Sequence, residues 1–150
     1  MKLSPVLLTS TLAVGVLCCG HHHKAKIPAG ARQTLHTLYP KVSRASWKIE
    51  DGNYEASFHY EGKEASLVLT ADGVLLEKEI EIPRSALPAA VLTILRQDYA
   101  DYTLEEAAIL ESDGVVRYEA EVEDEDHKID LIFDADGHLY KKEEKERDED

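Results

Sequence analysis

The stretch "DLIFDADGHLY" at residues 130–140 has a counterpart earlier in the chain, "SLVLTADGVLL" at residues 66–76. In both stretches a run rich in apolar residues leads into Ala-Asp-Gly, and further apolar residues follow. Asp-Gly between two such runs is typical of a tight turn that joins antiparallel strands. The stretch therefore predicts a β-hairpin that occurs twice, and this repeat guides the interpretation of the rest of the sequence.

The repeat extends well before the hairpin in each copy. "IPAGARQTLHTLYP" from Ile27 aligns with "LPAAVLTILRQDYA" from Leu87 at an offset of 60. "NYEASF" aligns with "RYEAEV" at an offset of 64, the same offset as the hairpin. Three blocks in the same order indicate a duplicated unit, and the change in offset predicts a longer loop between Tyr99 and Tyr118.

Each copy begins with a predicted amphipathic helix. Apolar residues recur at helical spacing in the two copies, at Leu87, Val91, Leu95 and Tyr99, and at Ala31, Leu35, Leu38 and Tyr39. That spacing forms one stripe on a helix, which would pack on a sheet. Ser85 is expected to cap the second helix, and Pro40 to end the first.

The segments after each helix alternate between apolar and polar residues, which is typical of strands with one buried face. The apolar positions are Tyr54, Ala56, Phe58 and Tyr60 in the first copy, and Val116, Tyr118, Ala120 and Val122 in the second. The strand aromatics, among them Trp47 and Tyr60, are expected in the core rather than as anchors for a partner. The sequence thus predicts an α+β fold of two tandem units, each with one helix on a three- or four-stranded antiparallel sheet. It leaves open whether the two sheets join.

The N-terminus is typical of an export signal, with Lys2 followed by an apolar run over residues 6–17. "VLCCG" resembles a bacterial lipoprotein signal box with Cys19 as the lipidated residue, and the alternative is an ordinary secretory signal cut nearby. We therefore expect an exported protein in the periplasm, at the outer membrane or secreted, with a lipid as its one membrane contact. The expected segments are a signal (1–19), a linker (20–26), two repeats (27–83 and 84–142) and a charged tail (143–150).

The charge is strongly acidic and unevenly placed. The net charge is −13, and seven Lys and Arg residues but no Asp or Glu precede residue 49. This balance argues against a nucleic-acid partner, because phosphates would be repelled. Glu119, Glu121 and Glu123 alternate along one predicted strand, and we interpret them as a solvated strand face rather than a site for a cation or basic partner.

Two groups of residues are weak candidates for metal ligands. With Gly137 at the sixth position of a calcium loop, Asp134 and Asp136 take the third and fifth positions and Glu143 the twelfth, but Ile132 falls on the first. The first copy has Thr70 in place of Asp134, so a turn without an ion is the better interpretation. His21, His22 and His23 could recruit a transition metal loosely, yet a linker fixes no geometry. We predict no metal site and no cofactor.

The sequence offers no catalytic residues. No Cys follows Cys19, and neither a Gly-x-Ser-x-Gly elbow, a Gly-rich phosphate loop nor a His-Glu-x-x-His motif is present. Carboxylates are plentiful, but an acidic surface is not a catalytic pair. We therefore expect that the protein is not an enzyme.

The second unit resembles a PepSY domain of the exported bacterial kind. The residues that carry the resemblance are "LPAAVLTIL", "VVRYEAEVE" and "HKIDLIFDADGHL". The first unit matches the same pattern through "IPAGARQTL", "GNYEASFHYEG" and "ASLVLTADGVLLEKEIEIP". Such a tandem arrangement is similar to the PepSY-like group of periplasmic proteins, which is related in fold to the beta-lactamase inhibitor proteins.

This resemblance implies a binding module. PepSY domains occur as propeptide segments that inhibit peptidases and as stand-alone exported modules, and the inhibitor relatives bind an enzyme with the open face of a sheet. We expect a non-catalytic module with a protein partner in the cell envelope, such as an enzyme that it inhibits or regulates through its open sheet face. The alternative is the binding of a cation or small ligand by the acidic surface and the His tract.

Overall fold

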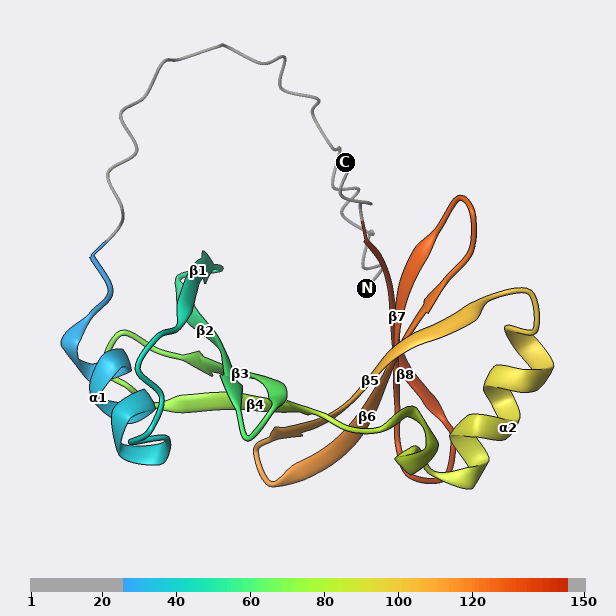
Figure 1. The fold of residues 1–150 in the computed structure, drawn as a ribbon, viewed down its shortest axis with the longest axis horizontal. Helices are drawn as coiled ribbons and strands as arrows, with labels where there is room; N and C mark the ends of the chain where they lie inside the picture. Colours follow the sequence, from blue (N-terminus) through green and yellow to red (C-terminus); the bar gives the residue numbers. More distant parts are fainter. Residues whose placement is uncertain (1–25, 146–150) are drawn as a thin grey trace, which may run out of the picture.

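Residues 26–145 are described by a computed structural model, in which eight antiparallel strands form one sheet with two α-helices (Figure 1). The strands lie in the sheet in chain order, so each pairs with the next one in sequence. The elements are α1 (Ala29–Leu38), β1 (Ser46–Glu50), β2 (Asn53–Tyr60), β3 (Lys63–Leu69), β4 (Leu75–Glu81), the 3-10 turn η1 (Arg84–Ala86), α2 (Ala89–Asp98), β5 (Thr103–Ser112), β6 (Val115–Glu123), β7 (Lys128–Phe133) and β8 (Leu139–Lys145).

The predicted α+β fold of two tandem helix-on-sheet units is wrong, because the strands form a single, mainly β structure. Strand β5, which the sequence did not predict, is the reason. It pairs with β4 from Glu77↔Ser112 to Glu81↔Ala108 and with β6 on its other side. The Ile82 N–H then donates to the Ala107 carbonyl at 2.8 Å and extends the junction. No sheet edge is left between the two halves.

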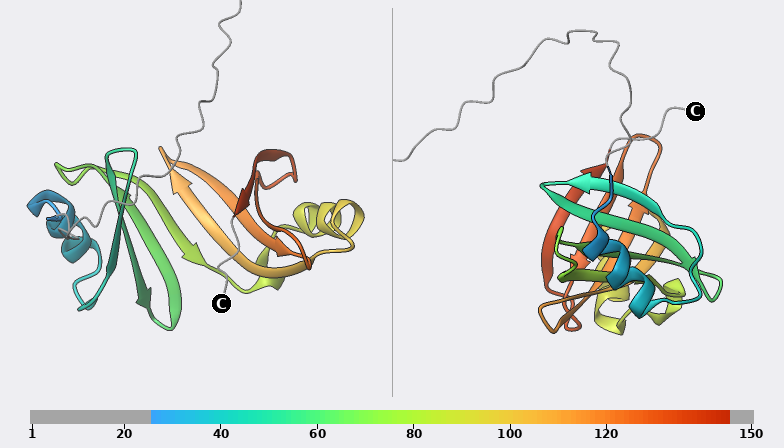
Figure 2. Two further views of the ribbon diagram at one scale, coloured as in Figure 1. Left: turned by 90° about the horizontal axis from the view of Figure 1, so that it is seen from above. Right: turned by 90° about the vertical axis from the view of Figure 1, so that its left-hand side faces the viewer.

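Both helices pack on the same face of the sheet, each over its own hydrophobic cluster (Figure 2). Below α1 the cluster is closed by residues of β2 and β3, namely Ala56, Phe58, Ala65, Leu67 and Leu69. Below α2 it is closed by residues of β5, β6 and β7, namely Ala107, Ala120, Val122, Ile129, Leu131 and Phe133. The opposite face of the sheet carries no helix among the described residues.

Each helix also comes close to the Ala-Asp-Gly turn of its own copy. A Cβ added to Gly30 in α1 would lie 2.5 Å from the carbonyl carbon of Asp72 in the β3–β4 turn, and Thr34 Oγ1 donates to the Gly73 carbonyl at 2.7 Å. In the second copy, a Cβ on Gly137 would lie 3.2 Å from that of Ala90 in α2. Both turn glycines have positive φ, 86° and 89°, which glycine adopts without strain. The hairpin prediction is therefore confirmed.

The local predictions had mixed outcomes. The alternation in β2 is confirmed, since Ala56 and Phe58 are buried. The prediction that Ser85 caps α2 is wrong, because Ser85 lies in η1 and the helix begins after Pro88 without a side-chain cap. Leu38 was expected to face the sheet but is 47% exposed.

Several predicted segments fall outside the described residues 26–145. These are the export signal with Cys19, the His tract His21, His22 and His23, and residues 146–150 of the charged tail. Residues 143–145 of that predicted tail belong to β8. Within the described part, neither α-helix has the length and apolar character that a membrane crossing requires.

Replacing Gly30 by Ala tests the contact between α1 and the turn. Alanine is the better helix former by about 1 kcal/mol, yet its methyl group would collide with the main chain of Asp72. We expect the free energy of unfolding, measured by urea denaturation, to fall by about 1–3 kcal/mol. Gln33→Ala, at an exposed position of the same helix, should change it by less than about 0.5 kcal/mol. Equal stability of the two variants would contradict the contact.

Candidate functional site

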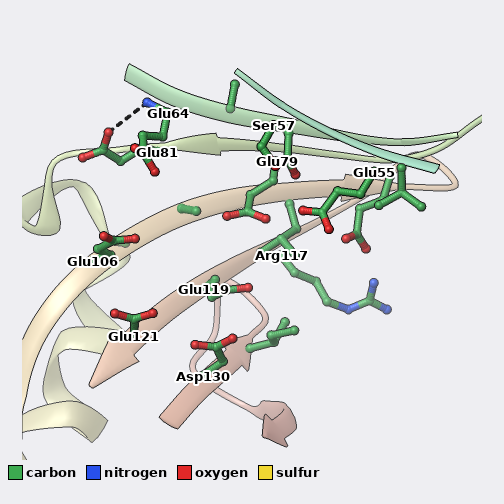
Figure 3. A pocket seen from close by; sticks show the side chains of 18 of the residues that line it. Glu55, Ser57, Glu64, Glu79, Glu81, Glu106, Arg117, Glu119, Glu121 and Asp130 are labelled. Atoms are coloured by element: carbon green, nitrogen blue, oxygen red, sulfur yellow. Dashed lines mark hydrogen bonds between the residues drawn. The ribbon is translucent and has the colours of Figure 1, made fainter. Parts of the chain in front are cut away.

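The helix-free face of the sheet is hollowed into a groove with a volume of about 870 Å³. The two halves of the twisted sheet incline toward each other across it, with the helices on the outside (Figure 2). All eight strands contribute to its lining, in which carboxylates outnumber Lys and Arg side chains by eleven to four. We call this hollow the acidic groove. Its centre carries Glu79, Glu106, Glu119, Glu121 and Asp130 (Figure 3).

The strand register places four carboxylates in one row across the groove. Glu106 of β5 is paired with Glu121 of β6, which is paired with Asp130 of β7. Asp130 is in turn paired with Glu143 of β8. Like charges directly opposite each other on neighbouring strands destabilise a sheet. The row therefore costs stability, and it has to be offset by nearby cations or by protonation.

Lysines at one side of the groove offset part of this row. Lys128 Nζ lies 2.9 Å from Glu121 Oε1, and Lys145 Nζ lies 2.5 Å from Asp130 Oδ2. The hydrogen bond to Glu121 raises the pKa of Lys128. Both acids are buried, with 7% of Glu121 and 6% of Asp130 exposed. Asp130 Oδ1 is also buried and has no hydrogen-bond partner within residues 26–145.

Glu79 and Glu119 are the strongly perturbed acids of the groove. Burial raises the pKa of Glu79 to about 7; the charge of Lys145 opposes this shift, and the carboxylates of Glu77 and Glu55 add to it. Burial also raises the pKa of Glu119 to about 8, and the carboxylates of Glu79 and Asp130 raise it further. Near neutral pH, Glu119 is therefore mainly a neutral acid that can donate a hydrogen bond, and an approaching cation would favour its ionised form.

The interpretation of the acidic strand as a solvated face is wrong at Glu121, which is buried. Sequence alternation showed which residues of β6 share a face, but not that Glu106 and Asp130 lie directly beside them.

The sequence analysis also missed Tyr140, an aromatic residue of the groove lining that is 66% exposed. The guanidinium carbon of Arg117 lies 3.9 Å from the centroid of its ring. Trp47 and Tyr60 pack against the first core cluster, as predicted.

The weak metal candidates Asp134 and Asp136 lie in the β7–β8 turn, away from the groove lining. With His138 they offer ligand atoms within 4.8 Å of one another. However, Asp134 Oδ1 accepts hydrogen bonds from the N–H groups of Asp136 and His138, both at 2.9 Å, and these bonds lower the pKa of Asp134. Glu143, the twelfth position of the calcium pattern, instead lies 2.6 Å from Lys141 Nζ.

The first hairpin closes its turn in the same way without a carboxylate. The Val74 N–H donates to Thr70 Oγ1 at 3.1 Å, where the second hairpin uses Asp134. A hydroxyl in the first copy and a carboxylate in the second accept the hydrogen bonds of the same turn. The need to close the turn therefore explains both Thr70 and Asp134 without a metal ion.

A family model described as "Putative beta-lactamase-inhibitor-like, PepSY-like" matches residues 52–141 as one region, which is more than half of the chain. The chain belongs to this family. The matched region runs from the β1–β2 turn into β8 and so includes the centre of the acidic groove. No curated protein matches this PepSY-like chain.

Two solved structures are similar to the PepSY-like protein in fold. A BLIP-like protein from Bacteroides fragilis has 26% identity and a TM-score of 0.62, and the match covers 82% of this chain and 90% of that one. A protein from Bacteroides eggerthii, described as "putative periplasmic", has 17% identity and a TM-score of 0.70, with 79% and 89% of the two chains covered.

The raised pKa of Glu119 predicts how the stability of the PepSY-like protein depends on pH. The folded protein keeps this proton up to about pH 8, while the unfolded chain releases it near 4.5. Between these values the folded state binds more protons, so this group lowers the free energy of unfolding as pH rises, by at most about 1.4 kcal/mol per pH unit.

Glu119→Gln, which resembles the protonated acid, should remove this contribution. We expect the variant to gain stability relative to the wild type between about pH 5 and about pH 8 in urea denaturation. Asp101→Asn, at an exposed site outside the groove, should show no such trend. A constant difference between Glu119→Gln and the wild type at every pH would contradict the raised pKa.

Proposed function

We propose that this protein is an exported, non-catalytic binding module that recognises a protein partner in the cell envelope through the acidic groove, and thereby inhibits or regulates an envelope enzyme. The observation that carries this proposal is the groove itself. It spans all eight strands, and both helices lie on the other face of the sheet. A broad, charged concave surface suits a protein segment better than a small substrate, whose pockets are mostly apolar.

The family and one neighbour support the proposal. The family description names a likeness to beta-lactamase inhibitors, and the Bacteroides fragilis neighbour is BLIP-like. The "putative periplasmic" neighbour and the N-terminal signal pattern support export, with Cys19 as the proposed lipid attachment site. The absence of a catalytic motif from the sequence favours binding over catalysis.

We also propose that the single sheet arose from a duplicated sequence. Residues 27–83 and 84–142 would be the two copies, preceded by a signal (1–19) and a linker (20–26) and followed by a charged tail (143–150). The equivalent contacts of Gly30 with Gly73 and of Ala90 with Gly137 support this origin. The duplication concerns the sequence, since the strands of both copies share one sheet.

Blocking the groove tests the proposed function. Ser57 is an exposed residue of the groove lining, so Ser57→Arg should obstruct it without disturbing the core. Gln97→Arg makes a matched change at an exposed position of α2. With the full chain as bait in an envelope extract, Ser57→Arg should capture at least about tenfold less partner than the wild type and Gln97→Arg do. Equal capture by both variants would contradict recognition through the groove.

Cation binding remains the alternative function, favoured by the proximity of Asp134, Asp136 and His138. His21, His22 and His23 would add a second, looser group of ligands. If this function holds, micromolar calcium or zinc should raise the melting temperature, because an ion that binds the folded state stabilises it. Asp134→Ser, which keeps a turn-closing hydroxyl, should abolish that rise. No rise with either ion would exclude the alternative.

A further inference from the structure

Three carboxylates at the centre of the acidic groove have fewer hydrogen bonds and ion pairs than their burial calls for. They are Glu79 of β4, Glu119 of β6 and Asp130 of β7, which lie near one another in Figure 3 and which we call the carboxylate cluster. The pKa of Glu119 is raised by both of the other two carboxylates, so the three charges interact. The cluster is therefore one electrostatic unit built from three strands.

Asp130 provides the strongest indication that the cluster binds a ligand. Its side chain is 8% exposed, and only Oδ2 is engaged, by Lys145 Nζ at 2.5 Å. Oδ1 is buried and accepts no hydrogen bond from residues 26–145. A buried acceptor without a donor costs free energy, and such groups are rare in folded proteins. A positive charge placed beside Asp130 would stabilise this carboxylate.

Glu79 and Glu119 also have little compensation for their negative charge when they are ionised. Both are half-buried, and neither takes part in an ion pair or hydrogen bond within the described residues. Lys145 of the groove lining forms an ion pair with Asp130, and Lys128, beside the groove, forms one with Glu121. The charge of Lys145 also lowers the pKa of Glu79 and of Glu119. Asp130 and Glu121 are thus held in ion pairs with ammonium groups, while Glu79 and Glu119 have no ion pair of their own among the described residues.

The spacing of the cluster indicates which kind of cation would bind. A metal ion needs ligand atoms gathered within a few ångströms, and among the described residues such a group is found only at Asp134, Asp136 and His138. A guanidinium carries five N–H donors in one plane and can reach several separate carboxylates. A lysine ammonium offers three donors on a flexible stem.

We propose that the carboxylate cluster is a subsite for an arginine or lysine side chain on an extended segment of the protein partner. This inference rests on the proposed function, since it names the chemistry by which the acidic groove recognises that partner. The groove volume of about 870 Å³ leaves room for the segment on either side of the basic residue. The basic side chain replaces the protons of Glu79 and Glu119 and adds positive charge beside Asp130.

Matched peptides test the subsite directly. The probes are the blocked peptide acetyl-Val-Arg-Val-Arg-Val-amide and its counterpart with citrulline, which keeps the shape of arginine without its charge. In calorimetric titrations of the full chain, the arginine peptide should bind at least about tenfold more tightly. Equal affinity of the two peptides would overturn the proposal.

The same titrations report the protons that the cation displaces. Because the pKa of Glu119 is about 8, binding near neutral pH should release protons, and the affinity should rise with pH toward about 9. The charged groups that face Glu119 are Glu79, Glu121, Asp130 and Lys145. The release is measured by comparing the binding heat in buffers of different ionisation enthalpy. Binding without proton release would contradict contact with Glu119.

Charge-neutralising variants locate the subsite. The affinity for the arginine peptide should fall by about tenfold in each of Glu119→Gln, Glu79→Gln and Asp130→Asn. Asp101→Asn, outside the groove, should leave this affinity unchanged. Glu79→Gln and Glu119→Gln retain the test if Asp130→Asn fails to fold. Equal weakening by Asp101→Asn would show attraction to net charge alone and would overturn the subsite. Displacement of the peptide by micromolar calcium would identify a metal site instead.

Capture from the envelope extract separates this inference from the proposed function. If Ser57→Arg loses the partner but Glu119→Gln and Glu79→Gln retain it fully, the groove binds a protein and the basic-residue subsite is wrong. If Ser57→Arg also retains the partner, the proposed function fails together with the subsite. Loss of the partner in all three variants supports both.

Discussion

The pairing of β4 with β5 is the interaction on which the rest of the structure depends. It joins the strands below α1 to those below α2 through a register that runs from Glu77↔Ser112 to Glu81↔Ala108. Without it each half would have an exposed edge, and unpaired edges invite association with other chains. With it, one face is covered by two helices and the other is left as a single concave surface. The acidic groove exists because this junction places β4 beside the acids of β5 and β6.

The row of carboxylates in the acidic groove lowers the stability of the sheet. Four carboxylates stand opposite one another across β5, β6, β7 and β8, and two of them are buried. A sheet selected only for stability would carry Thr, Val or opposite charges at such positions. The hydrophobic clusters under α1 and α2 meet the needs of folding on the other face. The arrangement of acids is therefore better explained by binding than by folding.

Much of this fold could be predicted where one residue pattern dictates one structure. The Asp-Gly turns could be predicted because few residues suit a tight turn between strands. The alternation in β2 could be predicted because burial of one strand face leaves a pattern of period two. β5 escaped prediction because a bulge interrupts it between Leu104 and Glu106 and because Ala107, Ala108 and Leu110 are buried on both of its faces. That missed strand led to the wrong expectation of two separate units.

The candidate site was less accessible to sequence reasoning than the fold. Glu119 and Glu121 could be assigned to one strand face, but their neighbours Glu106 and Asp130 are set by pairing between strands, which no local pattern specifies. Burial of an acid is also invisible in sequence, since its usual environment is water. The raised pKa of Glu119 follows from both of these features.

The order of the strands has a further consequence, for folding. Every strand pairs with its neighbour in sequence, so most of the sheet is assembled from hairpins that close short loops at small entropic cost. Only the pairing of β4 with β5 spans a longer segment, which contains η1 and α2. Proteins dominated by such contacts fold faster than those that must first bring distant segments together. The two hydrophobic clusters each form within a short span of chain. The acidic groove, in contrast, is lined by all eight strands and is complete only when the last strand is in place.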